Sequence, residues 1–258
     1  LKNNGLNLIS ETGNKNIKNV NVFQSIPEEI CYDFIISTIK LYDFDEFISC
    51  LKSCNVTNSI LLPFQNGIYS EKKITKEFGE GFSYGAVAQI SSFINNKQQI
   101  KHNGKLATFF VGKLSKNYDK KLEDFCKRCE VSKLDIRYRE NIEEKIWEKF
   151  IFLSAYSGIT TLTEKTIGEI FQSRVLSEKF TNAMIETYEL SKPFNVKFTD
   201  DPVEYWLQKI KKMPFNMTSS MYLDFKNKKR LELDWLSGSI IKYSREFGIN
   251  CPTHEEII

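Results

Sequence analysis

Residues 33–40 read Asp33-Phe34-Ile35-Ile36-Ser37-Thr38-Ile39-Lys40. The apolar residues in this stretch run continuously instead of alternating, which is typical of a strand covered on both faces of a parallel sheet. A helical pattern follows at residues 44–51, a second apolar run at 59–64 and a second helical pattern at 69–78. This βαβα order predicts a parallel sheet flanked by helices.

The pattern changes in the second half of the chain. Residues 106–111 and 134–138 still predict strands, with a helix at 122–129 between them. After about residue 140 the apolar spacing is helical, on two stripes: Ile142, Ile146, Phe150 and Leu153, and later Leu233, Leu236, Ile240 and Phe247. We therefore predict two domains, an α/β domain at 1–140 and an all-helical domain at 141–258.

Composition excludes several classes of protein. The chain has 258 residues, of which 41% are hydrophobic and 27% charged, so disorder, collagen and disulfide miniproteins are excluded. Its apolar runs are far shorter than the roughly 20 residues of a membrane helix, and no signal-peptide pattern opens it. The 36 Lys and Arg nearly balance the 33 Asp and Glu. We expect a soluble, cytoplasmic protein with reduced cysteines and with neither a nucleic-acid nor a membrane partner.

Two polar positions follow the first two predicted strands. Lys40 comes directly after residues 34–39, and Asn66-Gly67 follows residues 59–64. Ligands of open α/β sheets bind outside the carboxyl ends of the strands, so both positions are candidates for a site. Alternatively, Lys40 is a solvated charge and Asn66 a helix cap. A hairpin at Asn66-Gly67 is disfavoured because residues 69–78 have a helical pattern.

Lys149 is the most anomalous residue of the sequence. It lies three residues after Ile146 and four before Leu153, within an apolar stripe. Burial readily lowers the pKa of a lysine, which suits a general acid at near-neutral pH. The alternative is a lysine whose stem packs on the stripe while its amine reaches water.

A third group comprises Ser219-Ser220, before a short helical pattern, and Glu232, before the last apolar stripe. A favourable interaction with the helix dipole is the alternative explanation for Glu232. No metal site is expected, since Cys126 and Cys129 form a lone CxxC within a helical pattern and the chain has only two histidines. The glycines at 79–85 have the wrong spacing for a dinucleotide loop.

Seven stretches, in order, resemble the ketopantoate reductase (2-dehydropantoate 2-reductase) family across nearly the whole chain. They are Lys2–Leu6, Asp33–Lys40, Gln65–Ile68, Ile146–Phe150, Ser219–Met221, Glu232–Gly238 and Gly248–Thr253. The resemblance implies a Rossmann-like N-terminal domain whose first βαβ segment would precede Leu1. It also implies an all-α C-terminal domain of the 6-phosphogluconate dehydrogenase C-terminal-like type.

The resemblance also implies roles for single residues. Lys149 would be the catalytic proton donor, and Glu232 would hold the substrate hydroxyl and help to orient the lysine. Asn66 and Ser220 would bind substrate with Glu232, while Lys40, Asn66 and Glu232 would line the nicotinamide end of the cofactor site. The implied cofactor is NADPH and the implied partner a small 2-keto acid; homodimers occur in such families.

We expect an NADP-dependent oxidoreductase that reduces ketopantoate to pantoate in pantothenate and coenzyme A biosynthesis. Two alternatives stay open: a reductase of another 2-oxo acid, and a catalytically silent paralogue that binds a nucleotide or metabolite. The first is raised by Leu153, which stands where many family members carry asparagine, and by Ser157-Gly158, where a second asparagine is common. Retention of both Lys149 and Glu232 argues against the second.

Overall fold

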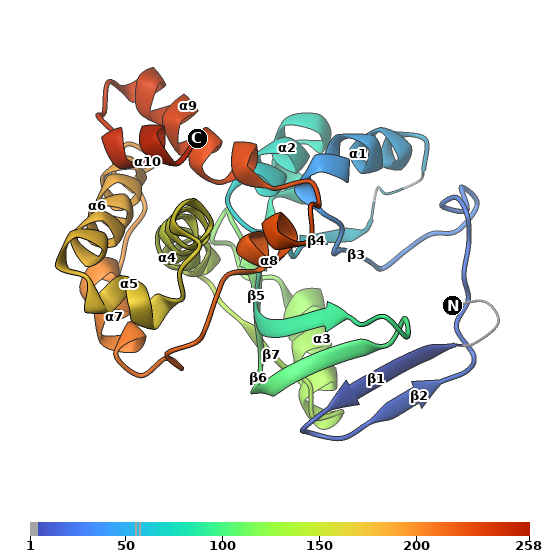
Figure 1. The fold of residues 1–258 in the computed structure, drawn as a ribbon. Helices are drawn as coiled ribbons and strands as arrows, with labels where there is room; N and C mark the ends of the chain where they lie inside the picture. Colours follow the sequence, from blue (N-terminus) through green and yellow to red (C-terminus); the bar gives the residue numbers. More distant parts are fainter. Residues whose placement is uncertain (1–4, 55, 57) are drawn as a thin grey trace. The chain divides into compact units, whose positions relative to one another are not determined.

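The computed structural model describes residues 5–54, 56 and 58–258 (Figure 1). The chain forms two compact units that interleave along the sequence. The first, here called the sheet unit, comprises Leu1–Ser37, Asp45–Phe64 and Glu80–Ile142. The second, the helical unit, comprises Thr38–Phe44, Gln65–Gly79 and Glu143–Ile258.

The sheet unit contains a five-stranded mixed sheet. Its strands are β1 (Leu6–Ser10), β2 (Lys15–Ile17), β5 (Tyr84–Ile94), β6 (Ile100–Lys113) and β7 (Asp135–Tyr138). The order is β2-β1-β6-β5. Strand β7 pairs with residues 108–111 of β6, whereas β1 pairs with residues 100–102. Strands β5 and β6 form a long antiparallel hairpin, whereas β1 and β7 run parallel to β6.

A separate pair of parallel strands, β3 (Phe34–Ser37) and β4 (Ile60–Pro63), lies in the same unit, with Phe34 opposite Ile60 and Ser37 opposite Pro63. All four residues of β4 are buried, as predicted for a strand covered on both faces. That expectation is wrong for β3, where Ile36 is 48% exposed. The unit also contains helices α1 (Phe44–Lys52, from its second residue) and α3 (Lys120–Val131) and the 3₁₀ turn η2 (Glu80–Phe82).

The predicted strands at 34–39, 59–64 and 134–138 are confirmed, as are the helices at 44–51, 69–78 and 122–129. The all-parallel sheet is wrong, because the run at 106–111 belongs to β6 in the antiparallel hairpin. The turn of this hairpin depends on Asn95, whose Oδ1 accepts hydrogen bonds from the backbone N–H groups of Lys97 and Gln99. Strand β5 was missed because its second half is exposed and lacks a continuous apolar run.

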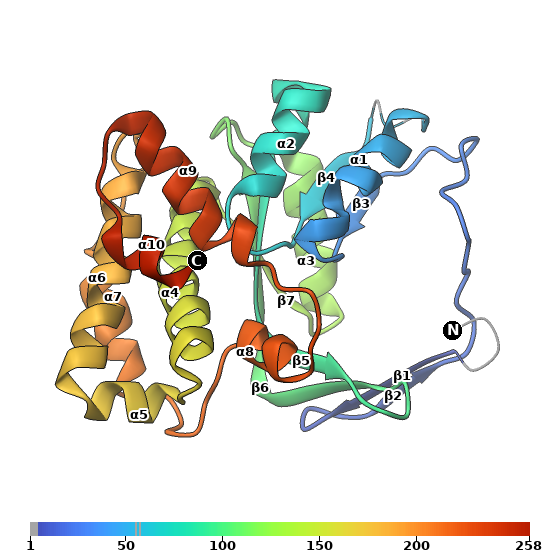
Figure 2. The same cartoon turned by 45° about the horizontal axis from the view of Figure 1, so that its top comes forward.

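The helical unit holds the other helices (Figure 2). They are α2 (Tyr69–Phe78), α4 (Ile142–Thr163, from its second residue), α5 (Ile167–Gln172), α6 (Arg174–Ser191), α7 (Pro202–Ile210), α8 (Ser220–Lys226), α9 (Ser237–Phe247) and α10 (Pro252–Ile257), with the 3₁₀ turns η1 (Leu41–Asp43) and η3 (Leu233–Trp235). Helix α6 contacts α5, α7, α9 and α10. In the described chain no strand follows residue 140, which confirms the all-helical second half.

Aromatic side chains fill the core of this unit. Phe152 of α4 stacks on Trp206 of α7 with ring centroids 4.2 Å apart, and Tyr156, one turn further along α4, also stacks on Phe152 at 5.0 Å. Stacked pairs of this kind contribute stability beyond the apolar area that they bury. Of the helices that the structure describes, none has the length and apolar character needed to cross a membrane.

His254 of α10 is completely buried beside α6 and α9. Its Nε2 lies 3.0 Å from both Thr187 Oγ1 and Ala183 O, and its Nδ1 lies 3.1 Å from Ser237 Oγ. Glu186 accepts hydrogen bonds from the backbone N–H groups of Thr253 and His254. Burial lowers the pKa of His254 to about 4, although the hydrogen bond with the Ala183 carbonyl opposes this.

We expect acid to destabilise the helical unit through His254. Below the ordinary histidine pKa of about 6.5 the unfolded chain binds a proton that the folded chain does not, so stability present above pH 6.5 is lost as the pH falls toward 4. The slope reaches at most about 1.4 kcal/mol per pH unit. Denaturant unfolding between pH 4 and 8 measures it, and His254→Gln should flatten the curve. Equal slopes for both proteins would contradict the assignment.

Candidate functional site

Two loops of the helical unit follow β3 and β4 and carry Lys40 and Asn66. They contact each other directly, because Gln65 Nε2 donates a hydrogen bond of 3.1 Å to the Ile39 carbonyl. Gly67 has a φ of +85°, and a Cβ at this position would lie 3.3 Å from the Trp235 carbonyl. The left-handed conformation and this close approach both favour glycine after Asn66.

Lys149 and Asn66 form the first polar pair of the site. Lys149 projects from α4 between the buried residues Ile146 and Phe150, and its Nζ donates a 2.7 Å hydrogen bond to Asn66 Oδ1. Burial lowers the pKa of Lys149 to about 8, while the negative charges of Glu71 and Glu232 oppose the shift. The amine is therefore partnered, not snorkelling, and it is poised to release a proton near neutral pH.

Glu232 and Lys40 form the second polar pair. Glu232 is only 7% exposed; its Oε1 accepts from the Leu41 backbone N–H at 3.0 Å and its Oε2 from Lys40 Nζ at 3.3 Å. Lys40 also donates to Asp224 Oδ2 of α8 at 2.8 Å. Burial alone would lower the pKa of Lys40, but the two carboxylates outweigh it and raise that pKa. Glu232 thus anchors a loop instead of capping a helix by its side chain.

The structure separates the roles of Ser219 and Ser220. Ser219 is buried and caps α8, because its Oγ accepts from the Tyr222 N–H and lies 2.7 Å from Thr160 Oγ1. Ser220, to which the resemblance assigns substrate binding, is exposed at the start of α8, one turn before Asp224. The helical unit thus brings together Lys40 with Glu232 and Asn66 with Lys149, and leaves the Ser220 side chain facing solvent.

Two acidic residues of this region were not predicted. Asp224 shares Lys40 with Glu232, and no local pattern distinguishes it. Glu71 is 4% exposed on α2, with Ser70 Oγ donating to its Oε2 at 3.1 Å. A signal for Glu71 existed, because it lies midway between the buried residues Ile68 and Ile74 on one helical face. The same reasoning identified Lys149.

The described residues contain no cluster of histidine, cysteine and carboxylate side chains that could hold a metal ion. Cys126 and Cys129 are free thiols on α3. Burial raises the pKa of Cys126 to about 11, so this thiol is not an activated nucleophile.

The sequence matches two family models. The model for ketopantoate reductase PanE/ApbA covers residues 1–116, and the model for the ketopantoate reductase PanE/ApbA C terminal covers residues 141–258. A 2-dehydropantoate 2-reductase of Pyrococcus abyssi is 29% identical over 95% of this chain and 81% of its own length. An uncharacterized oxidoreductase of Bacillus subtilis, YkpB, is 24% identical over 100% of this chain and 84% of its own.

Solved structures share the fold. A 2-dehydropantoate 2-reductase of Geobacter metallireducens superposes with a TM-score of 0.89 at 20% identity, covering 100% of this chain and 85% of that one. A D-mandelate dehydrogenase in a ternary structure with NADH and anilino(oxo)acetate gives a TM-score of 0.87 at 18% identity, covering 99% and 83%. Together with the family models, these structures confirm the predicted fold class, a Rossmann-like domain joined to an all-helical domain.

Replacing Glu71 should lower the pKa of Lys149. In Glu71→Gln the nearby negative charge is lost, and we expect the Lys149 pKa to fall below about 8. The rate at which trinitrobenzenesulfonate modifies Lys149, followed by mass spectrometry as a function of pH, reports this pKa. Glu77→Gln on the same helix, which removes a partner of Lys73 instead, is the control. An unchanged midpoint in Glu71→Gln would rule out the proposed electrostatic coupling.

Proposed function

The chain belongs to the ketopantoate reductase family of oxidoreductases, and from that premise we propose that it reduces 2-dehydropantoate to pantoate with NADPH, in pantothenate and coenzyme A biosynthesis. The observation that carries the proposal is the Lys149 amine, which is hydrogen-bonded to Asn66 and has a pKa of about 8. Reduction of a keto group needs a proton donor of this kind at the carbonyl oxygen.

A bound nicotinamide would supply the hydride to the keto carbon. Lys149 would donate its proton to the keto oxygen, and before transfer its positive charge would stabilise the negative charge that develops there. Asn66 would hold Nζ in place through its Oδ1, since a lysine ammonium can only donate hydrogen bonds. We assign Lys149 as the catalytic residue.

The side-chain amide of Asn66 also carries a hydrogen-bond donor, Nδ2. Its Nδ2 has no hydrogen-bond partner among the residues that the structure describes, and the side chain is partly exposed. This amide can donate to a carbonyl oxygen of the substrate or of the nicotinamide carboxamide. Lys40 and Asn66 both follow strands of an α/β sheet, where dinucleotides commonly bind, so the residues present fit such a cofactor. We propose 1–140 as the cofactor-binding region and 141–258 as the substrate-binding and catalytic region.

Glu232 and Ser220 complete the proposed substrate site. The Glu232 carboxylate is fixed by Lys40 and by the Leu41 N–H, so it can accept a hydrogen bond from a substrate hydroxyl without reorganising. Ser220 is exposed at the start of α8, where its hydroxyl can donate to a substrate carboxylate.

Leu153 favours a second candidate, the reduction of another 2-oxo acid. Leu153 lies one turn beyond Lys149 on α4 and packs partly against the apolar core of the helical unit. A leucine cannot hydrogen-bond a hydroxyl-bearing substrate, but it can contact an apolar group. The similarity in fold to a D-mandelate dehydrogenase is compatible with such a substrate.

The proposal predicts turnover that depends on Lys149. The natural gene product should oxidise NADPH in the presence of ketopantoate, followed by the loss of NADPH absorbance, and Lys149→Ala should lower kcat by about 10²- to 10⁴-fold. Lys145→Ala, on the same helix but paired with Glu148, is the matched control and should retain activity. A panel of 2-oxo acids distinguishes the two candidate substrates. Unchanged turnover in Lys149→Ala would show that the donor is another group.

The activity should also fall in alkaline solution. A general acid must be protonated before it reacts, so kcat/KM should be constant below the Lys149 pKa of about 8 and decline tenfold per pH unit above it. A pH profile of kcat/KM with saturating NADPH measures this limb. If the profile stayed flat to pH 10, Lys149 would not be the acid with this pKa.

A further inference from the structure

Arg230 occupies an unusual place beside the candidate site. Its guanidinium lies over the Tyr42 ring, 4.8 Å from the centroid, and over the Trp235 ring at 5.7 Å. Tyr42 and Trp235 themselves meet edge to face at 6.5 Å. In the described part of the chain Arg230 makes neither an ion pair nor a hydrogen bond, and it is exposed. Its hydrogen-bond donors therefore remain available.

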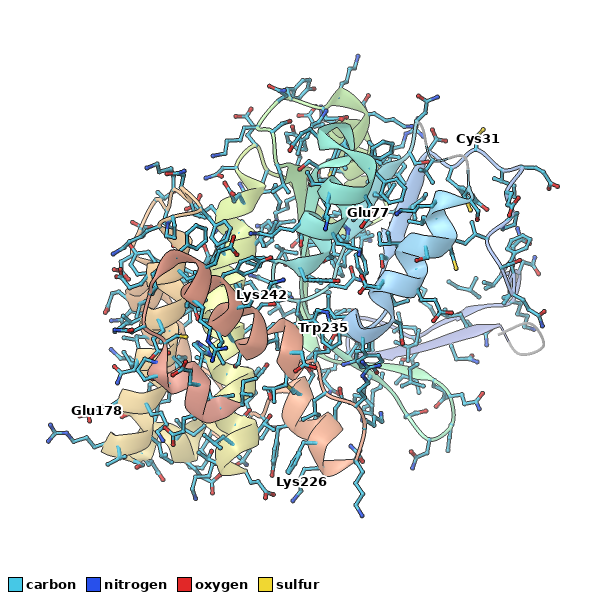
Figure 3. All side chains as sticks on the ribbon, turned by 90° about the horizontal axis from the view of Figure 1, so that it is seen from above. Cys31, Glu77, Glu178, Lys226, Trp235 and Lys242 are labelled. Carbon is cyan, nitrogen blue, oxygen red and sulfur yellow. The ribbon has the colours of Figure 1, made fainter. Side chains whose placement is uncertain are left out.

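The two rings beneath Arg230 belong to the segments that build the Lys40–Glu232 pair. Tyr42 lies two residues after Lys40, and Trp235, labelled in Figure 3, lies three residues after Glu232. The Glu232 bond to the Leu41 N–H ties these segments together. The aromatic platform is thus fixed by the same contact that fixes the candidate site. A guanidinium stacked on it is oriented before any ligand arrives, which lowers the entropy cost of binding.

The lysines of the region are already committed to its carboxylates. Lys40 lies 2.8 Å from Asp224 and 3.3 Å from Glu232, and the Lys229 amine lies 3.9 Å from Asp224. Lys149 interacts electrostatically with Glu71 and Glu232. These three amines and three carboxylates offset one another, so an anionic ligand such as a 2-oxo acid needs a further cation. Arg230 has no carboxylate partner in the described chain.

We propose that Arg230 is a further ligand-binding residue, which recognises an oxyanion of the ligand held at this site. The planar fork of the guanidinium matches two oxygens of a carboxylate or a phosphate. The inference rests on the proposed function and deepens it. Both ligands of the proposed reaction carry an oxyanion: the 2-oxo acid has a carboxylate and the nicotinamide nucleotide has phosphates. If Arg230 only packed on Tyr42 and Trp235, its replacement would lower the stability of the protein and leave ligand binding unchanged.

Kinetics of Arg230→Gln test the assignment. With the carboxylate as ligand, KM for the 2-oxo acid should rise roughly tenfold with little change in kcat, while the Kd of NADPH, read from its fluorescence, stays constant. With a phosphate as ligand, the Kd of NADPH should rise instead. Arg230→Lys, which keeps the charge but not the fork, should recover part of either loss. Arg174→Gln, which removes an exposed arginine of α6 that pairs with Glu178, is the control.

The inference and the proposed function can fail separately. If the wild-type protein reduces no 2-oxo acid, the proposed function fails, and Arg230 is then judged by calorimetric binding of oxamate, an unreactive 2-oxo acid analogue, and of NADPH. Weaker binding of either ligand to Arg230→Gln than to Arg174→Gln supports the inference. Equal binding to both variants, with or without a lower Tm in Arg230→Gln, overturns it, as does the absence of binding to the wild type.

Discussion

The candidate site depends on the hydrogen bonds that the buried carboxylate of Glu232 accepts. One oxygen accepts from the backbone of Leu41 and the other from Lys40, so a segment that follows β3 is tied to the segment before α9. Only the carboxylate is buried, since the Lys40 side chain is 39% exposed, so loss of these partners would leave the Glu232 charge uncompensated. The loop position of Lys40, the platform of Tyr42 and the approach of Trp235 to Gly67 all follow from this arrangement.

Lys149 shows the opposite use of burial. Its amine lies in an apolar stripe of α4, where removal from water favours the neutral form and lowers the pKa. Among the residues that the structure describes, its one hydrogen-bond acceptor is Asn66. Lys40 has two carboxylates at hydrogen-bonding distance, and its pKa is raised. The same residue type therefore serves as a permanent structural cation at one position and as an amine that can exchange its proton at the other.

Sequence reasoning succeeded where a signal was local and failed where it was not. Lys149 was found because a charge interrupts an apolar stripe, and helix α2 because a helical pattern follows Asn66-Gly67. The antiparallel pairing of β5 with β6 was not predicted, because its register depends on a turn at Asn95 and on long-range hydrogen bonds. The hydrogen bond from Lys149 to Asn66 joins residues 83 positions apart, and no spacing in the sequence encodes such a contact.

The compact units do not follow the linear order of the chain, and this has a consequence for the chemistry. Thr38–Phe44 and Gln65–Gly79 come from the first half of the sequence but belong to the helical unit. Contacts within that unit hold them: Phe44 meets Tyr69 edge to face, and the Lys72 amine lies over the Phe194 ring. Lys40 and Asn66 are therefore positioned by the same packed unit that positions Lys149 and Glu232. The distance from the amine to the amide that holds it is set inside one unit.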